Sequence, residues 1–344
     1  MEILFNLLFV PLIILINTLL KKNNYLLNYS GLKHQTYTNQ KSVPLSGGLI
    51  ILVFLTINFN NYESFFLISL YLFFLIAILG DLNLISSASI RFFLQIIFVI
   101  FFVYLFNLNI SDLRIELFNI FLKNEIFNYF FVAFCILVYV NGSNFIDGNN
   151  TLSIGYYIIV LLSILHLENL GISLIFDINF LNSFLFLLII LLIFNFFNKI
   201  YLGDNGIYLL SIFFAFTVLK IHSVDPYISP YFIAVIFWYP SFEILFSFIR
   251  KIKAKNSPMN ADNNHLHQLV FFYLTNKLRK KRYINSLTGL SINCLNLLPI
   301  IISLKDIYNT KHQVSILITS TIIYLIFFSL FYKYKKTSTL KKIV

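Results

Sequence analysis

Residues 181–222 read LNSFLFLLIILLIFNFFNKIYLGDNGIYLLSIFFAFTVLKIH, and this stretch gives the clearest indication of the fold class. Two apolar runs, 181–198 and 206–222, flank a polar turn that contains Leu-Gly-Asp-Asn-Gly at 202–206. A transmembrane helix needs about 20 mostly apolar residues, so each run is close to the length that crosses a bilayer. The stretch therefore predicts two membrane helices that meet at one surface of the membrane.

The rest of the chain has the same character. Its 344 residues are 59% hydrophobic and 11% charged, with a mean hydropathy of +0.83, whereas a soluble domain carries roughly a quarter charged residues. We therefore exclude a water-soluble fold and expect an all-α polytopic membrane helix bundle, with residues 1–344 as a single integral membrane domain. Apolar windows place about eleven spanning helices near 3–20, 47–60, 64–80, 92–106, 126–140, 151–167, 181–198, 206–222, 229–248, 287–304 and 314–331.

The basic residues orient this bundle, because positively charged loops stay on the cytoplasmic side. If the N-terminus lies outside and the C-terminus in the cytoplasm, 20 of the 25 Lys and Arg fall in inner segments. These inner segments are 21–46, 81–91, 141–150, 199–205, 249–286 and 332–344. The net charge of +11 does not indicate nucleic-acid binding, since that inference needs a basic surface on a soluble domain.

The acidic residues sort in the opposite direction. Nine of the 14 Asp and Glu lie in outer segments, and Glu243 lies within a span. Four isolated aspartates remain in inner loops: Asp81, Asp147, Asp204 and Asp262. Any one of them is compatible with an ordinary polar loop, but the four together indicate a gathered site.

Two motifs surround these aspartates with groups that bind polar ligands. In NGSNFIDG (residues 141–148), Asn141, Asn144 and Asp147 recur every three residues, which on a helical turn places the two amides and the carboxylate along one edge. Carboxylate oxygens are suitable ligands for a hard cation. In the turn at 202–206, glycines on both sides of Asp204 allow close approach to a phosphate or metal, and an ordinary tight turn is the alternative.

A third pair of polar residues flanks a short inner loop. Asp81 follows Gly80 at the end of one span, and Arg91 begins the next span with Gln95 one turn later. The acid and the base can be a solvated pair. Alternatively, a carboxylate held near a cation and a lipid phosphate can accept a proton or bind a metal.

Two further inner loops contain histidine. Asp262, His265 and His267 lie in the longest and most basic loop, where histidines two residues apart can both reach one phosphate. Zinc is not expected there, because no cysteine and no third histidine lies nearby. The first inner loop contains His34 and leads to Gly48, where paired glycines mark either a close helix crossing or a backbone surface for a ligand.

The ninth predicted span is irregular in sequence. Pro230, Trp238 and Pro240 interrupt its apolar residues, and prolines kink membrane helices. Glu243 follows about one turn from the inner end, where it can pair with Arg250, bond a neighbouring backbone group or act in catalysis.

Taken in order, these residues resemble the motifs of the polyprenyl-phosphate N-acetylhexosamine-1-phosphate transferases. These enzymes form glycosyltransferase family 4, which also includes the phospho-N-acetylmuramoyl-pentapeptide transferases. The resemblance runs from about residue 30 to 270, and its motifs all lie on the predicted cytoplasmic side. It implies that the inner loops 21–46, 81–91, 141–150, 199–205 and 249–286 are the catalytic cytoplasmic loops of a bacterial inner-membrane enzyme.

The resemblance implies a reaction and its participants. A sugar-1-phosphate would pass from a UDP-N-acetylhexosamine to undecaprenyl (polyprenyl) phosphate with release of UMP. This would be the first membrane step of cell-envelope polysaccharide or glycan synthesis. The cofactor would be Mg²⁺, with Mn²⁺ as the alternative. The partners would be the UDP-sugar, the polyprenyl phosphate lipid and the membrane itself, without nucleic acid, and a homodimer stays open.

The resemblance also implies roles for residues at matching positions. Magnesium would be bound by Asp204 and Asp147. The catalytic residues would be Asp81, Asp147, Asp204, His265 and His267. The substrate-binding residues would be His34, Gly48, Arg91, Asn141, Asn144 and Asp262.

Three positions depart from the family pattern, and two alternative functions stay open. Gly80 stands where the family usually has the first Asp of an Asp-Asp pair, Asn205 where a serine commonly follows the aspartate of the Gly-Asp turn, and Gln268 where a further histidine is frequent. One alternative is a transporter or flippase for a lipid-linked sugar, which should carry ionisable groups near the bilayer midplane. The other is a family member that binds lipid phosphate or nucleotide-sugar without turnover.

Overall fold

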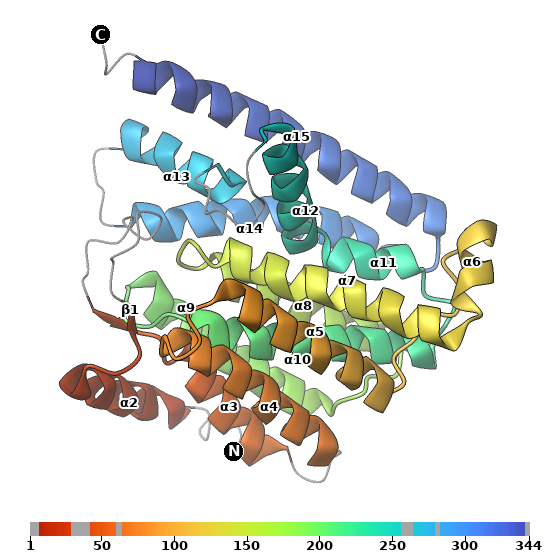
Figure 1. The fold of residues 1–344 in the computed structure, drawn as a ribbon, viewed down its shortest axis with the longest axis horizontal. Coiled ribbons are helices and arrows are strands. Elements are labelled where there is room, and N and C mark those ends of the chain that lie inside the picture. The colour runs from red at the N-terminus through yellow and green to blue at the C-terminus, as the bar shows by residue number, and fades with distance from the viewer. Residues whose placement is uncertain (1–6, 29–41, 60–63, 256–263, 279–282, 341–344) are drawn as a thin grey trace.

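The computed structural model describes residues 7–28, 42–59, 64–255, 264–278 and 283–340. These residues are almost entirely helical, which confirms the predicted all-α membrane bundle (Figure 1). Eight of the described helices are long and apolar enough to cross a membrane. They are α4 (Ser64–Asp81), α5 (Ala88–Leu105), α7 (Glu125–Ile146), α8 (Leu152–Asn169), α9 (Ile178–Phe196), α10 (Gly203–Val224), α14 (Ile284–Ser303) and α15 (Thr310–Leu340).

A further pair of apolar helices is sharply bent where the two helices meet, and it adds a ninth crossing if the pair forms one span. The helices α11 (Pro230–Ile236) and α12 (Trp238–Lys253) meet at an angle of 78°, and Figure 1 shows α12 leaving the direction of α11. Pro240 lacks an N–H and would clash with the carbonyl of Ile236 in a straight helix. The Ile236 carbonyl instead accepts a hydrogen bond from the Tyr156 hydroxyl of α8, which satisfies a group that the bend leaves free.

By the criterion of helix length, the described residues contain eight or nine crossings, fewer than the predicted number of about eleven. Each predicted apolar window overlaps a described helix, but the two described helices nearest the N-terminus are short. Within the described residues, α2 (Phe9–Asn23) has 15 residues and α3 (Gly47–Asn58) has 12. At about 1.5 Å per residue, α3 extends about 18 Å, which is less than the hydrocarbon core of about 30 Å. Length therefore supports eight or nine crossings.

The remaining elements are small. Two helices, α6 (Glu116–Leu122) and α13 (Leu266–Lys277), lie at opposite ends of the bundle (Figure 1). The strands β1 (Leu27–Asn28) and β2 (Val43–Pro44) form one antiparallel pair, with Leu27 opposite Pro44. The Tyr201 N–H donates to the Pro44 carbonyl and the Gly47 N–H donates to the Tyr201 carbonyl. These bonds fix β2 and the start of α3 beside the turn that leads into α10.

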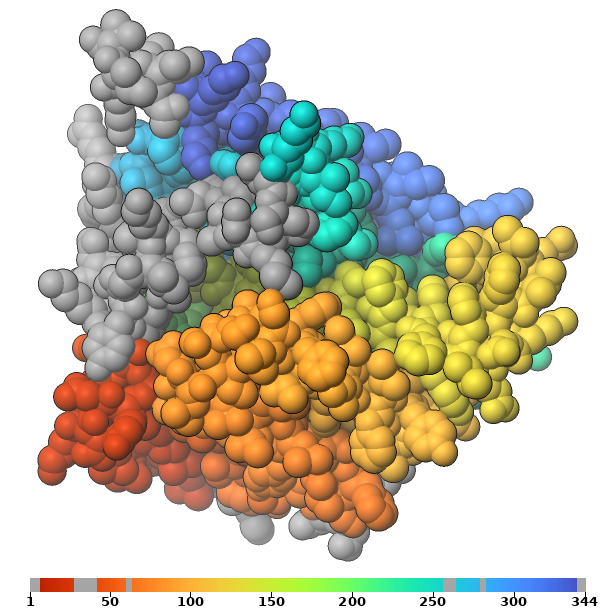
Figure 2. All heavy atoms as spheres, in the orientation of Figure 1, coloured from red at the N-terminus to blue at the C-terminus, as the bar shows by residue number. Residues whose placement is uncertain are grey.

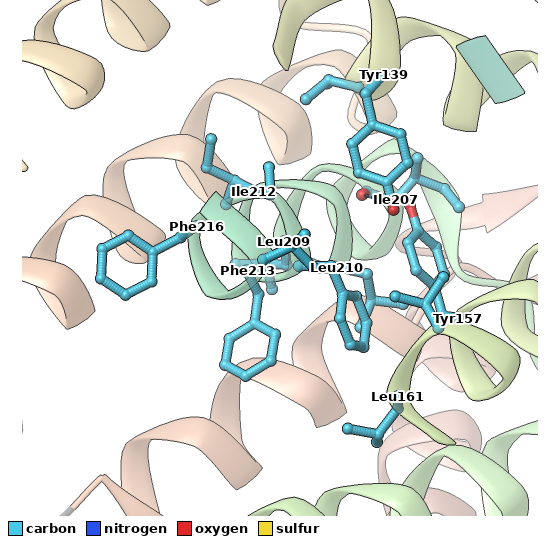
Figure 3. Close-up of a cluster of buried hydrophobic side chains, with 14 of the residues drawn as sticks. Tyr139, Tyr157, Leu161, Ile207, Leu209, Leu210, Ile212, Phe213 and Phe216 are labelled. Atoms are coloured by element: carbon cyan, nitrogen blue, oxygen red, sulfur yellow. Dashed lines mark hydrogen bonds between the residues drawn. The ribbon is translucent and has the colours of Figure 1, made fainter. Parts of the chain in front are cut away.

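The helix α10 occupies the centre of the bundle. It contacts α3, α4, α7 and α8, and 83% of its most apolar window is buried. Figure 3 shows side chains of α10, such as Leu210 and Phe213, among Tyr139 of α7 and Tyr157 of α8. The space-filling view shows α4, α5 and α7 in front of this core and α12 and α15 above them (Figure 2). A central, buried α10 provides a firm base for the polar residues at its first turn.

Candidate active site

The first turn of α10 carries the best-connected aspartate of the predicted site. Asp204 accepts a hydrogen bond from Arg91 Nη1 at 2.7 Å on Oδ2 and from Asn144 Nδ2 at 2.9 Å on Oδ1. Arg91 comes from the start of α5 and Asn144 from the last turn of α7. Three helices that are distant in sequence thus meet at one carboxylate. About a quarter of the Asp204 side-chain surface is exposed to solvent.

Asp81, the last residue of α4, binds the beginning of α10. Its Oδ1 accepts from the Asp204 N–H at 3.2 Å, and its Oδ2 accepts from the Asn205 N–H at 2.9 Å and from Asn205 Nδ2 at 2.5 Å. The first N–H groups of a helix have no partner within the helix, and a carboxylate there is favoured by the helix dipole. Asp81 therefore acts as a cap for α10 that comes from another helix, and it holds Asp204 in place.

The sequence placed Arg91 opposite Asp81, but the structure pairs Arg91 with Asp204. Gly80 explains how the side chain reaches that far. A Cβ atom at position 80 would lie 2.9 Å from both Cδ and Nη1 of Arg91, closer than real side chains pack. The absence of a side chain at Gly80 thus leaves the volume through which Arg91 extends from α5 to Asp204.

The hydrogen bonds of the Asn205 side chain explain why asparagine suits this position. Its side-chain NH₂ donates to Asp81 and to the Leu45 carbonyl, at 2.5 and 3.2 Å, and so joins α4, α10 and the segment before α3. A Cβ at Gly48 would overlap Asn205 Oδ1 and the backbone of α10. Gly48 is buried, so its position allows α3 to approach the first turn of α10. Its predicted contact with substrate stays a prediction.

A second layer of polar contacts lies below Asp204. Asn141 Nδ2 donates to Gln95 Oε1 at 3.0 Å, and Gln95 Nε2 donates to the Tyr208 hydroxyl of α10. These bonds link α7, α5 and α10 about one turn from the Asn144–Asp204 contact. Asn141 therefore has partners within the protein, and the structure gives it a role in fixing the helix that carries Asn144.

Asp147 follows the last residue of α7 and brings a third carboxylate to this end of the bundle. Burial, together with the neighbouring charges of Asp204 and Asp81, raises the pKa of Asp147 to about 8. The three carboxyl groups thus repel one another when they are ionised. Among the described residues, the ion pair at this cluster is the one between Arg91 and Asp204. A bound cation would offset this repulsion and favour the ionised form of the carboxyl groups.

The donor atoms fit magnesium better than zinc. Zinc requires at least three His, Cys, Asp or Glu side chains that converge on one position. Among the described residues, no such group is present. Magnesium is usually held by one or two carboxylates together with water and substrate phosphates. Asp204 and Asp147 carry carboxylate oxygens of that kind, so the residues present are compatible with the predicted Mg²⁺, whose binding stays a prediction.

The predicted histidines lie against the same end of α7. His265 precedes α13 and His267 lies in its first turn, with their rings stacked at 5.6 Å between centroids. A Cβ at Gly148 would lie 2.8 Å from His267 Nε2, so His267 packs on the residue that follows Asp147. Burial, aided by the charge of His265, lowers the pKa of His267 to about 3. His267 is therefore a neutral, buried ring beside the carboxylates.

Two predicted residues cannot be placed. His34 and Asp262 lie outside the described residues, and their substrate-binding roles stay predictions. Gln268, at the position where a further histidine was expected, accepts a hydrogen bond from the His265 N–H at 3.2 Å and so closes the start of α13.

Sequence reasoning missed the partner of Glu243. This residue lies in α12, and its Oε1 accepts a hydrogen bond from the Leu266 backbone N–H at 3.4 Å, in keeping with the predicted bond to a backbone group. The side-chain partners were not predicted: Glu243 contacts His265 Nδ1 at 2.9 Å and accepts from the Tyr324 hydroxyl of α15 at 2.7 Å. The available signal was the presence of an acidic residue inside an apolar span, since such a group needs partners.

A comparison with known proteins agrees with this arrangement. Residues 63–222 match the family model described as Glycosyl transferase family 4. This stretch includes Asp81, Arg91, Asn144, Asp147 and Asp204, and the match supports membership of the chain in that family of phosphosugar transferases. No curated protein matches the chain.

Proposed function

We propose that this member of glycosyl transferase family 4 transfers a sugar-1-phosphate from a UDP-N-acetylhexosamine to polyprenyl (undecaprenyl) phosphate and releases UMP. The observation that carries the proposal is the meeting of Asp81, Asp147 and Asp204, from three separate helix ends, beside the guanidinium of Arg91. The family match supports a phosphosugar transferase of this general kind.

The chemistry requires charge control more than covalent participation of the protein. An oxygen of the lipid phosphate would form a bond to the sugar-linked phosphorus of the donor. The bond from that phosphorus to the bridging oxygen would break, and UMP would leave. Both reactants are anions, so alignment and charge neutralisation dominate the barrier. Magnesium, when bound, would supply much of that neutralisation.

The residues of this chain would divide the work. Asp204 and Asp147 would hold the metal, while Asp81 keeps the first turn of α10, and with it Asp204, in a fixed position. Arg91 balances part of the carboxylate charge and can also contact an anionic phosphate. His265 and His267 lie on the α13 side of α7 and would contact the phosphates of the donor.

The position of the carboxylates favours an enzyme over a transporter. Asp81 is the last residue of α4, Asp147 follows the last residue of α7, and Asp204 lies in the first turn of α10. A transporter for a lipid-linked sugar should carry its ionisable groups near the middle of the bilayer. Carboxylates at helix ends are instead suited to water-soluble UDP-sugar and the headgroup of a lipid.

Location and pathway complete the proposal. Since the predicted inner loops are the basic ones, the site would face the cytoplasm at a bacterial inner membrane, with the N-terminus outside. The reaction would then begin the assembly of a cell-envelope polysaccharide or glycan. A homodimer stays a prediction.

The decisive experiment measures UMP release by the purified full-length protein. A panel of UDP-N-acetylhexosamines would be supplied with undecaprenyl phosphate, with and without Mg²⁺, and with Mn²⁺ in its place. We expect release that needs both the lipid and the metal, and the preferred donor identifies the sugar. Folded protein that releases no UMP from any donor would contradict the proposal and favour a binding or transport function.

A further inference from the structure

Glu243 is a buried carboxylate with partners from two other elements. Its side chain is 1% exposed, within the bent apolar helix pair α11 and α12. Oε1 lies 2.9 Å from His265 Nδ1, and Oε2 accepts from the Tyr324 hydroxyl at 2.7 Å. Burial of a carboxylate is costly unless it is paired and hydrogen-bonded. The three side chains therefore form one connected polar network, which we call the Glu243 network.

The Glu243 network restricts how His265 can lie. A carboxylate on Nδ1 selects the tautomer and directs Nε2 to the opposite edge of the ring. Phe145 of α7 contacts the ring edge-on at 5.2 Å, and His267 stacks on its face at an interplanar angle of 7°. The His265 ring is thus fixed in direction as well as in place.

The same contacts lead back to the carboxylate cluster. Phe145 lies between Asn144, which donates to Asp204, and the Asp147 turn. His267 packs on Gly148. The network therefore runs from α15 through Glu243 and His265 to the end of α7 that carries two residues of the candidate active site.

We propose that Glu243 and Tyr324 are positioning residues that orient His265 so that its Nε2 contacts a phosphate of the nucleotide-sugar. When Nε2 also carries a proton, the ring is a cation that Glu243 balances, and such a ring donates to an anionic oxygen. The identity of this ligand rests on the proposed function, whereas the orientation of the ring does not. The site thereby extends to α15, which lies beyond the matched residues 63–222.

Removal of single polar atoms tests the proposal in the UMP-release assay. Tyr324→Phe deletes one hydroxyl, and Tyr332→Phe is the matched control, because Tyr332 is an exposed tyrosine of the same helix. Groups that orient a functional histidine typically contribute about 10- to 100-fold. We expect kcat/KM for the donor to fall about tenfold in Tyr324→Phe and about 100-fold in Glu243→Gln. The Tyr332→Phe control should stay within about twofold of wild type.

A double-mutant cycle separates positioning from a general structural role. If Glu243 acts through His265, then Glu243→Gln should cost less than about threefold when it is added to His265→Gln. Thermal unfolding in detergent would show that each variant is folded. Effects that multiply independently in the folded double variant would overturn the proposal.

A spectroscopic readout is independent of turnover. In protein labelled with ¹⁵N-histidine, the His265 signal is identified by its loss in His265→Gln. We expect a protonated Nδ1 in wild type and a changed ¹⁵N shift in Glu243→Gln but not in Tyr332→Phe. An unchanged signal in Glu243→Gln would overturn the inference even if UMP release is normal. The expected shifts in a protein that releases no UMP would instead contradict the proposed function alone.

Discussion

Asp204 and Glu243 are both carboxylates with a basic side chain at hydrogen-bond distance, but they differ in what surrounds them. Both oxygens of each carboxylate bond to side chains of the protein. Asp204 nevertheless keeps about a quarter of its side chain exposed and lies near two other aspartates, whereas Glu243 is 1% exposed. The comparison separates a carboxylate that solvent or a ligand can still reach from one that the fold encloses.

The largest effect that we expect is loss of activity in Asp204→Asn. The amide keeps the shape of the side chain but removes the negative charge that would hold the metal. UMP release should fall about 1,000-fold or more, with an unchanged unfolding temperature. Asp177→Asn is the matched control, because Asp177 caps α9 and asparagine is an equally good cap. Near-normal activity of Asp204→Asn would remove this residue from the site.

Glu243→Ala should show the opposite pattern, with a large effect on folding. The change removes the shared partner of His265 and Tyr324 and leaves buried polar groups without a bond. Breaking a buried charged pair costs about 3–5 kcal/mol, so we expect a marked drop in the unfolding temperature in detergent. If the protein keeps its wild-type stability, the contrast between the two carboxylates is wrong.

Gly80→Ala should have an intermediate effect on activity. The added Cβ would occupy the path of the Arg91 side chain and weaken its ion pair with Asp204. We expect kcat/KM to fall about tenfold, because the weakened contact is an ion pair with a partly exposed carboxylate. The same change in an Arg91→Ala background should have little further effect. Equal losses in both backgrounds would show that Gly80 does not act through Arg91.

The smallest predicted effect is that of Asn205→Ser. Serine keeps one hydroxyl for Asp81 but cannot also reach the Leu45 carbonyl, so one hydrogen bond is lost. The free energy of unfolding should fall by about 1 kcal/mol, and activity should stay within about threefold. A large loss of activity would mean that Asn205 contacts substrate directly.

The sequence predicted the helices and the grouping of the aspartates because both depend on local signals. Apolar runs identify spans, and the excess of Lys and Arg in alternate loops indicates which loops share a side. Asp81, Asp147 and Asp204 could therefore be placed together before their contacts were known. Arg91 and Asn144 lie in the same loop motifs, and the family resemblance implied their substrate-binding roles.

The missed features depend on contacts between distant residues or on the exact length of an element. Glu243 and Tyr324 are 81 residues apart, and no pattern in either segment points to the other. Arg91 reaches Asp204 rather than Asp81 because Gly80 leaves a path, which only the packing reveals. The windows for α2 and α3 are apolar like the others, so composition did not distinguish these short helices from full crossings.

The burial of α10 has a consequence for the mobility of the candidate site, which lies between α10, with Asp204, and α13, with His267. Amides in a helix packed on all sides open only with the whole protein, so hydrogen exchange along α10 should be the slowest in the chain. Asp204, at the tip of this helix, therefore keeps its place whenever the protein is folded. The short helix α13 rests on one side of the bundle and tolerates change more readily. We therefore expect faster hydrogen exchange in α13 than along α10.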